Sequence, residues 1–240
     1  MDVSLIIPAY NEEQYIGATL ESVKRASRHA FGGKAAIETI VVDNASTDGT
    51  AAVAISYATK LVRESHRNVA RARNAGASAA TGDVLVFLDA DTLVPERFFS
   101  RITEVMRDSQ CLGGSPDIKH VSKRRWVRGY LALWRCVGRI AGMAQGAAQF
   151  CRRDAFASVG GYDERLFMGE DVDFYWRLRK FAKRRGSYLR FISDLQLRPS
   201  PRRFDQWPAW RILVWTNPLF MWLFRRRRSV WRGWYDEAVR

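Results

Sequence analysis

The sequence predicts an α/β protein built on a doubly wound, mostly parallel sheet. Three short apolar runs, at residues 3–7, 40–42 and 84–88, have the composition of buried parallel strands. Segments with helical periodicity separate them, and strands that alternate with helices form a parallel sheet covered on both faces. Ligands of such sheets bind beyond the carboxyl ends of the strands. The residues that follow each run are therefore the first candidates for a site.

The remaining elements follow from caps and apolar spacing. Asn11 is expected to cap the first helix, because two acids follow it in the first turn and apolar residues recur on one face. The same patterns predict, in order, helices at about 49–59 and 69–80, a strand at 147–151 followed by a short helix, and a helix at 170–184.

The composition is that of an ordinary globular protein with a strong positive charge. Of 240 residues, 47% are hydrophobic and 27% charged, which argues against a disordered or collagen-like chain. The net charge of +14 favours anionic partners: nucleic acid, phosphorylated metabolites or the acidic face of a membrane. The three cysteines are far apart, which argues against a disulfide scaffold or zinc ribbon and favours a reducing compartment.

The sequence predicts neither a signal peptide nor a membrane span. The apolar start runs straight into Pro8. The longest apolar stretch, 212–224, has 13 residues, whereas a span takes about 20. We therefore expect a cytoplasmic protein.

Each of the three runs leads into a polar cluster, at residues 8–12, 43–49 and 89–91. Clusters at neighbouring strand ends should converge on one cleft. In the last of them, Asp89 and Asp91 stand two positions apart, so both can offer oxygens to one hard divalent cation that also bridges a diphosphate. Mg²⁺ and Mn²⁺ suit such a site and would stabilise a departing phosphate.

Six short motifs occur in order along the chain: Pro8-Ala9-Tyr10-Asn11-Glu12, residues 42–50, Ala72-Arg73-Asn74-Ala75-Gly76, residues 87–91, Gly160-Gly161-Tyr162-Asp163-Glu164 and Glu170-Asp171-Val172-Asp173. Together they resemble the motifs of family 2 glycosyltransferases with the GT-A fold, over about residues 2–205. The resemblance implies a GT-A sheet with a Rossmann-like nucleotide half. It also implies inverting transfer of a sugar from a nucleotide donor with a divalent metal, Mn²⁺ or Mg²⁺.

The resemblance assigns the donor site by position. The implied lining of the nucleotide-sugar pocket is Pro8, Tyr10, Glu12, Asp43, Arg73, Asp89 and Ala90. Asp91 would be the principal metal ligand, with Asp89 on the ribose or the metal, and the Arg73 guanidinium would reach the base or the diphosphate. Two simpler readings stay open: that Asp43 caps its own turn beside Ser46, and that Arg73 is a solvated helix arginine.

For the chemistry, the resemblance points to Asp171 as the general base. Inversion at an anomeric carbon needs a carboxylate that takes the proton of the acceptor hydroxyl while the diphosphate departs from the opposite face. The alternative is that Glu170 and Asp171 only favour the start of a helix. The implied acceptor-binding residues are Gly161, Tyr162, Asp163 and Glu170. Trp176, farther along the same helix, is expected in the core.

The sequence departs from the family pattern in two places. Processive members carry a QxxRW motif after the base, and Asp205-Gln206-Trp207 offers no equivalent, so we expect transfer of a single sugar. No histidine follows His120 to serve as a further metal ligand. One possibility is that Asp91, the diphosphate and water are the only metal ligands. The other is that arginines of the segment where the histidine would be expected take part of the diphosphate charge: Arg198, Arg202 and Arg203.

We expect one domain at 1–205, with a nucleotide-binding half (1–110) and an acceptor half (111–205), and a basic segment at 206–240. From Arg198 onward there are ten arginines against three acids, and six of the nine tryptophans. Tryptophan and arginine around a short apolar stretch suit an element that lies on an anionic membrane surface, here through 207–240. Packing on its own domain and a dimer interface are the alternatives.

The expected function is transfer of a single sugar, from a UDP-sugar in preference to other donors, to a hydroxyl of a cell-envelope glycan or lipid-linked acceptor. We expect peripheral contact with the inner face of the membrane and no nucleic acid partner. The alternatives are a nucleotidyltransferase, whose Gly-rich basic loop is missing after the first run, a nucleic-acid-binding protein, which an acid-rich cleft disfavours, and a catalytically silent homologue. The sugar and the oligomeric state stay open.

Overall fold

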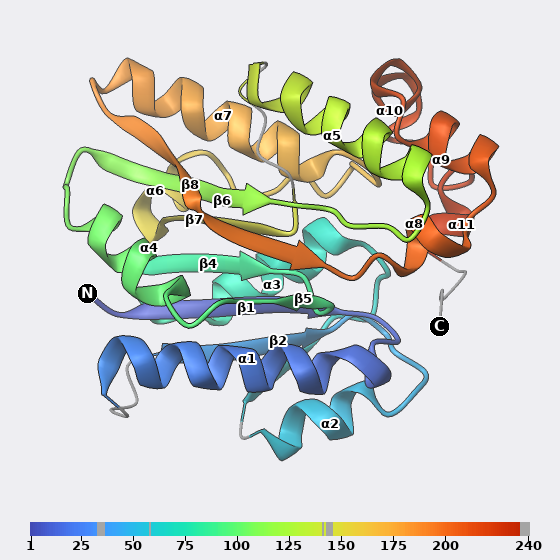
Figure 1. Cartoon of the computed structure of the whole chain (residues 1–240). Coiled ribbons are helices and arrows are strands. Elements are labelled where there is room, and N and C mark those ends of the chain that lie inside the picture. Colours follow the sequence, from blue (N-terminus) through green and yellow to red (C-terminus); the bar gives the residue numbers. More distant parts are fainter. Residues whose placement is uncertain (33–36, 58, 141, 143–145, 236–240) are drawn as a thin grey trace.

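The computed structural model describes residues 1–32, 37–57, 59–140, 142 and 146–235 (Figure 1). The strands are β1 (Val3–Ala9), β2 (Ile37–Asp43), β3 (Lys60–Arg63), β4 (Val84–Leu88), β5 (Thr92–Leu93), β6 (Cys111–Ile118), β7 (Ala148–Arg152) and β8 (Tyr188–Pro199). The helices are α1 (Glu13–Phe31), α2 (Thr50–Ser56), α3 (Val69–Ala79), α4 (Phe98–Met106), α5 (Arg125–Ile140), α6 (Arg153–Ser158), α7 (Glu170–Arg184), α8 (Arg202–Gln206), α9 (Ala209–Trp215), α10 (Pro218–Phe224) and α11 (Arg232–Tyr235).

The strands of the described residues form one eight-stranded sheet in the order β3-β2-β1-β4-β7-β6-β8-β5. Strands β1 to β4 pair in parallel. Beyond β4 the sheet is mixed, because β7 runs antiparallel to both β4 and β6, β8 is parallel to β6, and β5 is antiparallel to β8. The predicted parallel arrangement therefore holds for the first half of the chain, and the second half departs from it.

Helices cover both faces of the sheet because successive residues of a strand point to opposite sides. In β1, Leu5 and Ile7 join a core with α1, α2 and α4, whereas Ile6 joins a core with α3, α6 and α7. Figure 1 shows α1 in front of the sheet and α3 behind it. Burial on both faces explains why the inner strands are continuous apolar runs in the sequence.

A third, smaller core joins α5 to the C-terminal segment. Val127 and Leu131 of α5 pack with Trp207, Trp215 and Trp231. In Figure 1, α5 lies beside α9 and α10. Of the three roles considered for the segment after residue 205, packing on its own domain is therefore observed for one side of its helices.

The first helix does not begin as predicted. Asn11 has a φ of 52°, in the left-handed region, and α1 starts at Glu13 with Glu12 at the N-cap position. The Asn11 side chain instead accepts a hydrogen bond from the Thr47 backbone N–H at 2.8 Å. Asparagine tolerates this conformation better than most residues, and its contact ties the end of β1 to the loop after β2.

The sequence does not predict β6, because Gly113, Gly114 and Pro116 weaken the strand pattern. The structure gives a reason for the glycines. A Cβ at Gly113 would overlap the Phe150 carbonyl, and one at Gly114 would overlap the Arg190 carbonyl. The neighbouring strands therefore approach so closely that a side chain does not fit.

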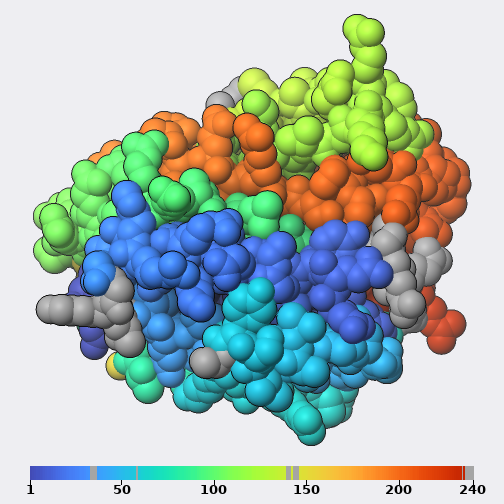
Figure 2. Space-filling view, turned by 60° about the horizontal axis from the view of Figure 1, so that its bottom comes forward, coloured from blue at the N-terminus to red at the C-terminus, as the bar shows by residue number. Residues whose placement is uncertain are grey.

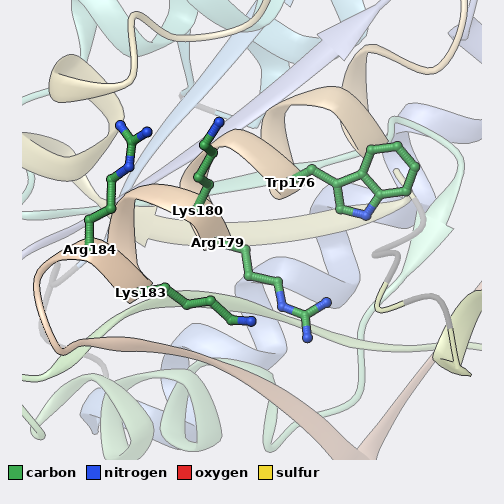
Figure 3. A pocket seen from close by; sticks show the side chains of 5 residues that line it. All are labelled: Trp176, Arg179, Lys180, Lys183 and Arg184. Atoms are coloured by element: carbon green, nitrogen blue, oxygen red, sulfur yellow. The ribbon is translucent and has the colours of Figure 1, made fainter.

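Trp176 was expected in the core and is instead 46% exposed on α7. With four basic residues of the same helix it lines an open hollow of about 520 Å³ (Figure 3). These residues are Arg179, Lys180, Lys183 and Arg184. The outer face of α7 is thus strongly basic.

The motif around Arg73 reflects close packing of α3 on the sheet. A Cβ at Gly76 would overlap Ile6 of β1 and would lie 2.9 Å from Val42 of β2. Glycine at this position lets the helix lie directly on the two strands. The packing brings Arg73 to the residues that follow β4.

Candidate active site

Four segments of the chain meet at the carboxyl ends of the strands. Three of them, after β1, β2 and β4, were predicted. The fourth is the end of β8, where the Ser200 N–H donates to the Asp91 carbonyl at 3.1 Å and Pro199 pairs with Thr92. Arginines of this segment were predicted at the diphosphate, whereas the strand β8 that carries the chain there was not predicted.

A buried arginine connects two of the predicted site acids. Arg73 is 3% exposed. Its Nη1 donates to Oε1 of Glu170 at 2.7 Å, and its Nη2 donates to Oδ1 of Asp89 at 3.0 Å and to the Gly146 carbonyl at 3.3 Å. Arg73 is therefore not a solvated helix arginine. It holds the residue after β4 against the first residue of α7.

The charge of Arg73 is secure in this setting. Burial alone would lower the pKa of its guanidinium, but Tyr162 and the carboxylates of Glu170, Asp89 and Asp171 raise that pKa above its ordinary value. Glu170, predicted to bind the acceptor, is 7% exposed and paired with Arg73. This contact holds Glu170 in place at the start of α7.

Asp171 follows Glu170 in the first turn of α7. Burial, then the negative charge of Glu170, raise the pKa of Asp171 to about 7, while Arg73 acts in the opposite direction. A Cβ at Gly146 would lie 2.6 Å from Asp171 Oδ2, so glycine leaves room for the carboxylate there. Gln149 holds the turn by donating to the Asp171 carbonyl at 3.1 Å. A carboxylate with this pKa can accept a proton near neutral pH.

A second arginine lies between Glu12 and Asp91. The Nη2 of Arg202, at the start of α8, donates to Oε1 of Glu12 and lies 3.3 Å from Asp91 Oδ2. Its guanidinium carbon sits 4.3 Å from the centre of the Tyr15 ring. Glu12, predicted in the base and ribose pocket, therefore binds Arg202 in this structure. Of the three arginines assigned to the diphosphate, Arg202 is at the site.

Arg203 also acts on this site, whereas Arg198 is exposed on β8 opposite Leu93. Burial, then the negative charge of Asp89, raise the pKa of Asp91, and Arg202 and Arg203 oppose the rise. Burial likewise lowers the pKa of Arg203, although the charge of Asp91 raises it. Two of the three predicted arginines thus compensate the acids at the strand ends.

The acids around Arg202 suit a divalent cation. Oε2 of Glu12 is buried and finds no hydrogen-bond partner among the described residues. The carboxylates of Glu12 and Asp91 share one guanidinium, and hard cations such as Mg²⁺ and Mn²⁺ prefer such oxygens. Within the described ranges, no group of three or more His, Cys, Asp or Glu side chains is placed to hold a metal. Asp91 and Glu12 would therefore hold a cation together with donor oxygens and water.

The residues predicted to line the base pocket lie at the carboxyl ends of β1 and β2. Tyr10 lies under the guanidinium of Arg67, whose central carbon is 3.7 Å from the ring centre. Asp43 is 9% exposed and accepts from the Ser46 N–H at 2.9 Å, which is the turn-capping contact considered as the alternative. Pro8 is buried in β1 opposite Val42. The sequence did not single out Arg67, because other arginines surround it in the chain.

The turn predicted to bind the acceptor packs against α3 and β7. Tyr162 is 2% exposed, and its hydroxyl donates to Gln149 Oε1 at 3.1 Å. Its N–H donates to Asn74 Oδ1 at 2.9 Å, and Gly161, also buried, would clash with the same amide if it carried a Cβ. Gly161 and Tyr162 therefore fasten the turn to α3, and their contact with an acceptor stays a prediction. Asp163, next to them, pairs with Arg165.

A family model described as glycosyl transferase family 2 matches residues 4–160. This stretch is more than half of the chain and holds the clusters after β1, β2 and β4. The chain belongs to glycosyl transferase family 2. Family membership confirms the resemblance drawn from the six motifs and favours it over the nucleotidyltransferase and nucleic-acid-binding alternatives. The match ends ten residues before Glu170.

The glycosyltransferase AglE of Haloferax volcanii is 27% identical over 206 residues, which are 80% of this chain and 65% of AglE. The chain spans between 30% and 65% of the length of the curated relatives compared with it.

Two solved structures share the fold. The mannosyltransferase PcManGT of Pyrobaculum calidifontis, in complex with GDP-Man and Mn²⁺, has a TM-score of 0.66 at 23% identity, and covers 88% of this chain and 59% of its own. S. aureus TarS 1–349, in complex with UDP-GlcNAc, has a TM-score of 0.64 at 19% identity, over 82% of this chain and 58% of its own. These likenesses confirm the expected GT-A fold.

The raised pKa of Asp171 predicts a pH-dependent stability. Its pKa is about 7 in the folded chain and about 3.9 in an unfolded one, so the folded state binds more protons and loses stability as the pH rises between these values. Asp171→Asn removes this loss and should make the chain more stable than wild type at about pH 8, by about 1–4 kcal/mol. Urea unfolding at several pH values measures the difference. The exposed Asp2→Asn is the control and should follow wild type. If the unfolding free energies of wild type and Asp171→Asn changed with pH in parallel, the raised pKa of Asp171 would be contradicted.

Proposed function

We propose that the chain transfers a single sugar from a nucleoside diphosphate sugar to an acceptor hydroxyl, with inversion and with a divalent metal. The observation that carries the proposal is Asp171, a carboxylate with a pKa of about 7 joined through Arg73 and Glu170 to Asp89. This reaction needs a general base with a pKa near neutral pH. It also needs acidic residues at the neighbouring strand end. The absence of a QxxRW motif after the base supports transfer of one sugar and not a polymer.

In this mechanism the oxygen of the acceptor hydroxyl attacks the anomeric carbon, and Asp171 accepts the proton of that hydroxyl. Arg73 keeps Glu170 and Asp89 in place and limits the pKa of Asp171. Arg202 and Arg203 stabilise the negative charge that develops on the departing diphosphate, because fixed positive groups stabilise charge that forms in a transition state. A divalent cation on Asp91, Mn²⁺ or Mg²⁺, would supply further charge stabilisation as a Lewis acid.

We propose a UDP-sugar as the donor and a cell-envelope glycan or lipid-linked hydroxyl as the acceptor. The complex of TarS with UDP-GlcNAc supports the uridine base, and that of PcManGT with GDP-Man makes guanosine the competitor. The basic segment 207–240 would contact an anionic membrane from the cytoplasmic side. Seven arginines against two acids, Asp236 and Glu237, in this segment support that contact.

Calorimetric titration of UDP and GDP, each with and without Mn²⁺, tests the donor site. Metal-dependent binding of UDP is expected, and Asp91→Asn should abolish it. Asp171→Asn should bind UDP as wild type does and lose transfer by about 10²–10⁴-fold, the usual contribution of a general base. Failure of both nucleotides to bind would overturn the donor proposal. Near-normal turnover of Asp171→Asn would overturn the base.

Arg202 predicts a measurable competition with metal. Arg202→Ala leaves Glu12 and Asp91 without their shared cation and should destabilise the chain by about 3 kcal/mol. Mn²⁺ should then raise the unfolding temperature of the variant more than that of wild type, because ligand binding to the folded state stabilises it. Arg198→Ala, an exposed arginine of the same segment, is the control. An equal response to Mn²⁺ in all three proteins would show that Arg202 does not occupy a cation site.

A further inference from the structure

The exposed apolar side chains concentrate on three helices of the second half. Of the fifteen large apolar side chains exposed in the described part of the chain, nine belong to α5, α9 and α10. They are Trp126, Leu133, Val137, Trp210, Leu213, Val214, Leu219, Trp222 and Leu223. The opposite sides of the same helices already bury apolar residues in the third core. The outer residues are therefore not accounted for by folding.

The exposed residues are spaced to form stripes. On α5, Trp126, Leu133 and Val137 are seven and four positions apart, which places them on one side of a helix. On α10, Leu219 is 66% and Trp222 61% exposed. Figure 2 shows the yellow-green surface of α5 adjoining the orange surface of the C-terminal segment. The two parts are also joined by the Tyr130 and Thr216 hydroxyls, 2.7 Å apart.

Positive charge surrounds these stripes. Residues 118–140 contain seven Lys and Arg and no acid, and residues 206–235 contain six Arg and no acid. The exposed arginines include Arg125, Arg128, Arg226, Arg227 and Arg228. Two copies of this surface would repel each other, whereas a partner that is anionic at its surface and apolar beneath it complements both properties.

The lengths of the helices agree with a position on a membrane surface. Helices α9 and α10 have seven residues each, about 10 Å. None of the helices in the described ranges is long and apolar enough to cross a bilayer. Short amphipathic helices with tryptophan and arginine lie in the plane of the membrane interface instead.

The same segment is attached to the candidate active site at three points. Arg202 of α8, which leads into α9, binds Glu12. The Arg225 carbonyl accepts from the Phe167 N–H at 2.7 Å, just before the turn that carries Asp171. The Tyr235 carbonyl accepts from Arg67, which covers Tyr10. The C-terminal segment that carries α9 and α10 is therefore fastened to residues of the candidate active site.

We propose that α5, α9 and α10 together form a docking surface for an anionic lipid bilayer, which presents a membrane-anchored acceptor to Asp171. This extends the membrane contact suggested for 207–240 by a second, separate part of the chain, α5, and by named residues. Presentation of a membrane-anchored acceptor to Asp171 rests on the proposed function. Binding to lipid does not depend on the donor site.

Co-sedimentation of the full chain with vesicles tests the surface. Wild type should bind vesicles of phosphatidylcholine and phosphatidylglycerol, bind pure phosphatidylcholine more weakly, and lose binding as salt is added. Trp222→Glu should lower binding to the anionic vesicles by about tenfold or more, because it removes an interfacial anchor and adds a repelled charge. On α5, Leu133→Glu should lower it as well, which the tail alone would not explain.

The matched control is Trp176→Glu, an exposed tryptophan in the basic hollow of α7 (Figure 3), which should bind like wild type. Wild-type binding by Trp222→Glu, or an equal loss in Trp176→Glu, would overturn the proposal. So would a dimer in light scattering that Trp222→Glu dissociates, because the surface would then join two copies. Unchanged UDP binding and unfolding temperature in Trp222→Glu separate this test from failure of the donor site or of folding.

Discussion

The site depends on one buried ion pair network, centred on Arg73. A guanidinium that is 3% exposed must be paired, because an uncompensated buried charge costs several kcal/mol. Its partners are Asp89 after β4 and Glu170 at the start of α7. The network therefore prevents the end of the parallel half of the sheet from separating from the helix that carries Asp171. The raised pKa of Asp171 follows from the same arrangement, because burial and the neighbouring Glu170 act on it together.

A second constraint comes from the return of the chain to the site. Strand β8 reaches the residues after β4, where Ser200 binds the Asp91 backbone, and the next helix brings Arg202 to Glu12. The strong positive charge of the sequence thus serves two places. A few arginines compensate acids at the strand ends, and many others are exposed on the second half, among them Arg125, Arg128 and Arg226. In either place, positive charges without an anionic partner would repel one another and destabilise the fold.

The sequence predicts the parts of the fold whose signal is local. The strand at Val84–Leu88 and the helix at Glu170–Arg184 have the predicted bounds, because an apolar run between turn residues and a helix with acids in its first turn are patterns of neighbouring residues. The contacts of Arg73 could not be predicted in this way. Its partners lie 16 and 97 positions away, and the resemblance alone directed it toward a ligand.

The failures in the second half have equally specific causes. Strand β6 carries glycines that the close approach of its neighbours requires, and these erase the strand pattern. Tyr162 stands in a turn of polar and glycine residues, which favours exposure, yet Gln149 satisfies its hydroxyl inside the core. Trp176 has the spacing of a core residue but lies on a basic outer face. For β6 and Tyr162, a tertiary contact outweighs the local pattern.

Arg73 and Glu170 act as one unit that holds the site together. A double-mutant cycle of Arg73→Met, Glu170→Gln and the combined variant, followed by urea unfolding, measures the coupling between them. Arg73→Met alone should cost about 3–5 kcal/mol. The combined variant should cost less than the two single changes added together, by about 1–3 kcal/mol. Free energies that add within about 0.5 kcal/mol would contradict the account.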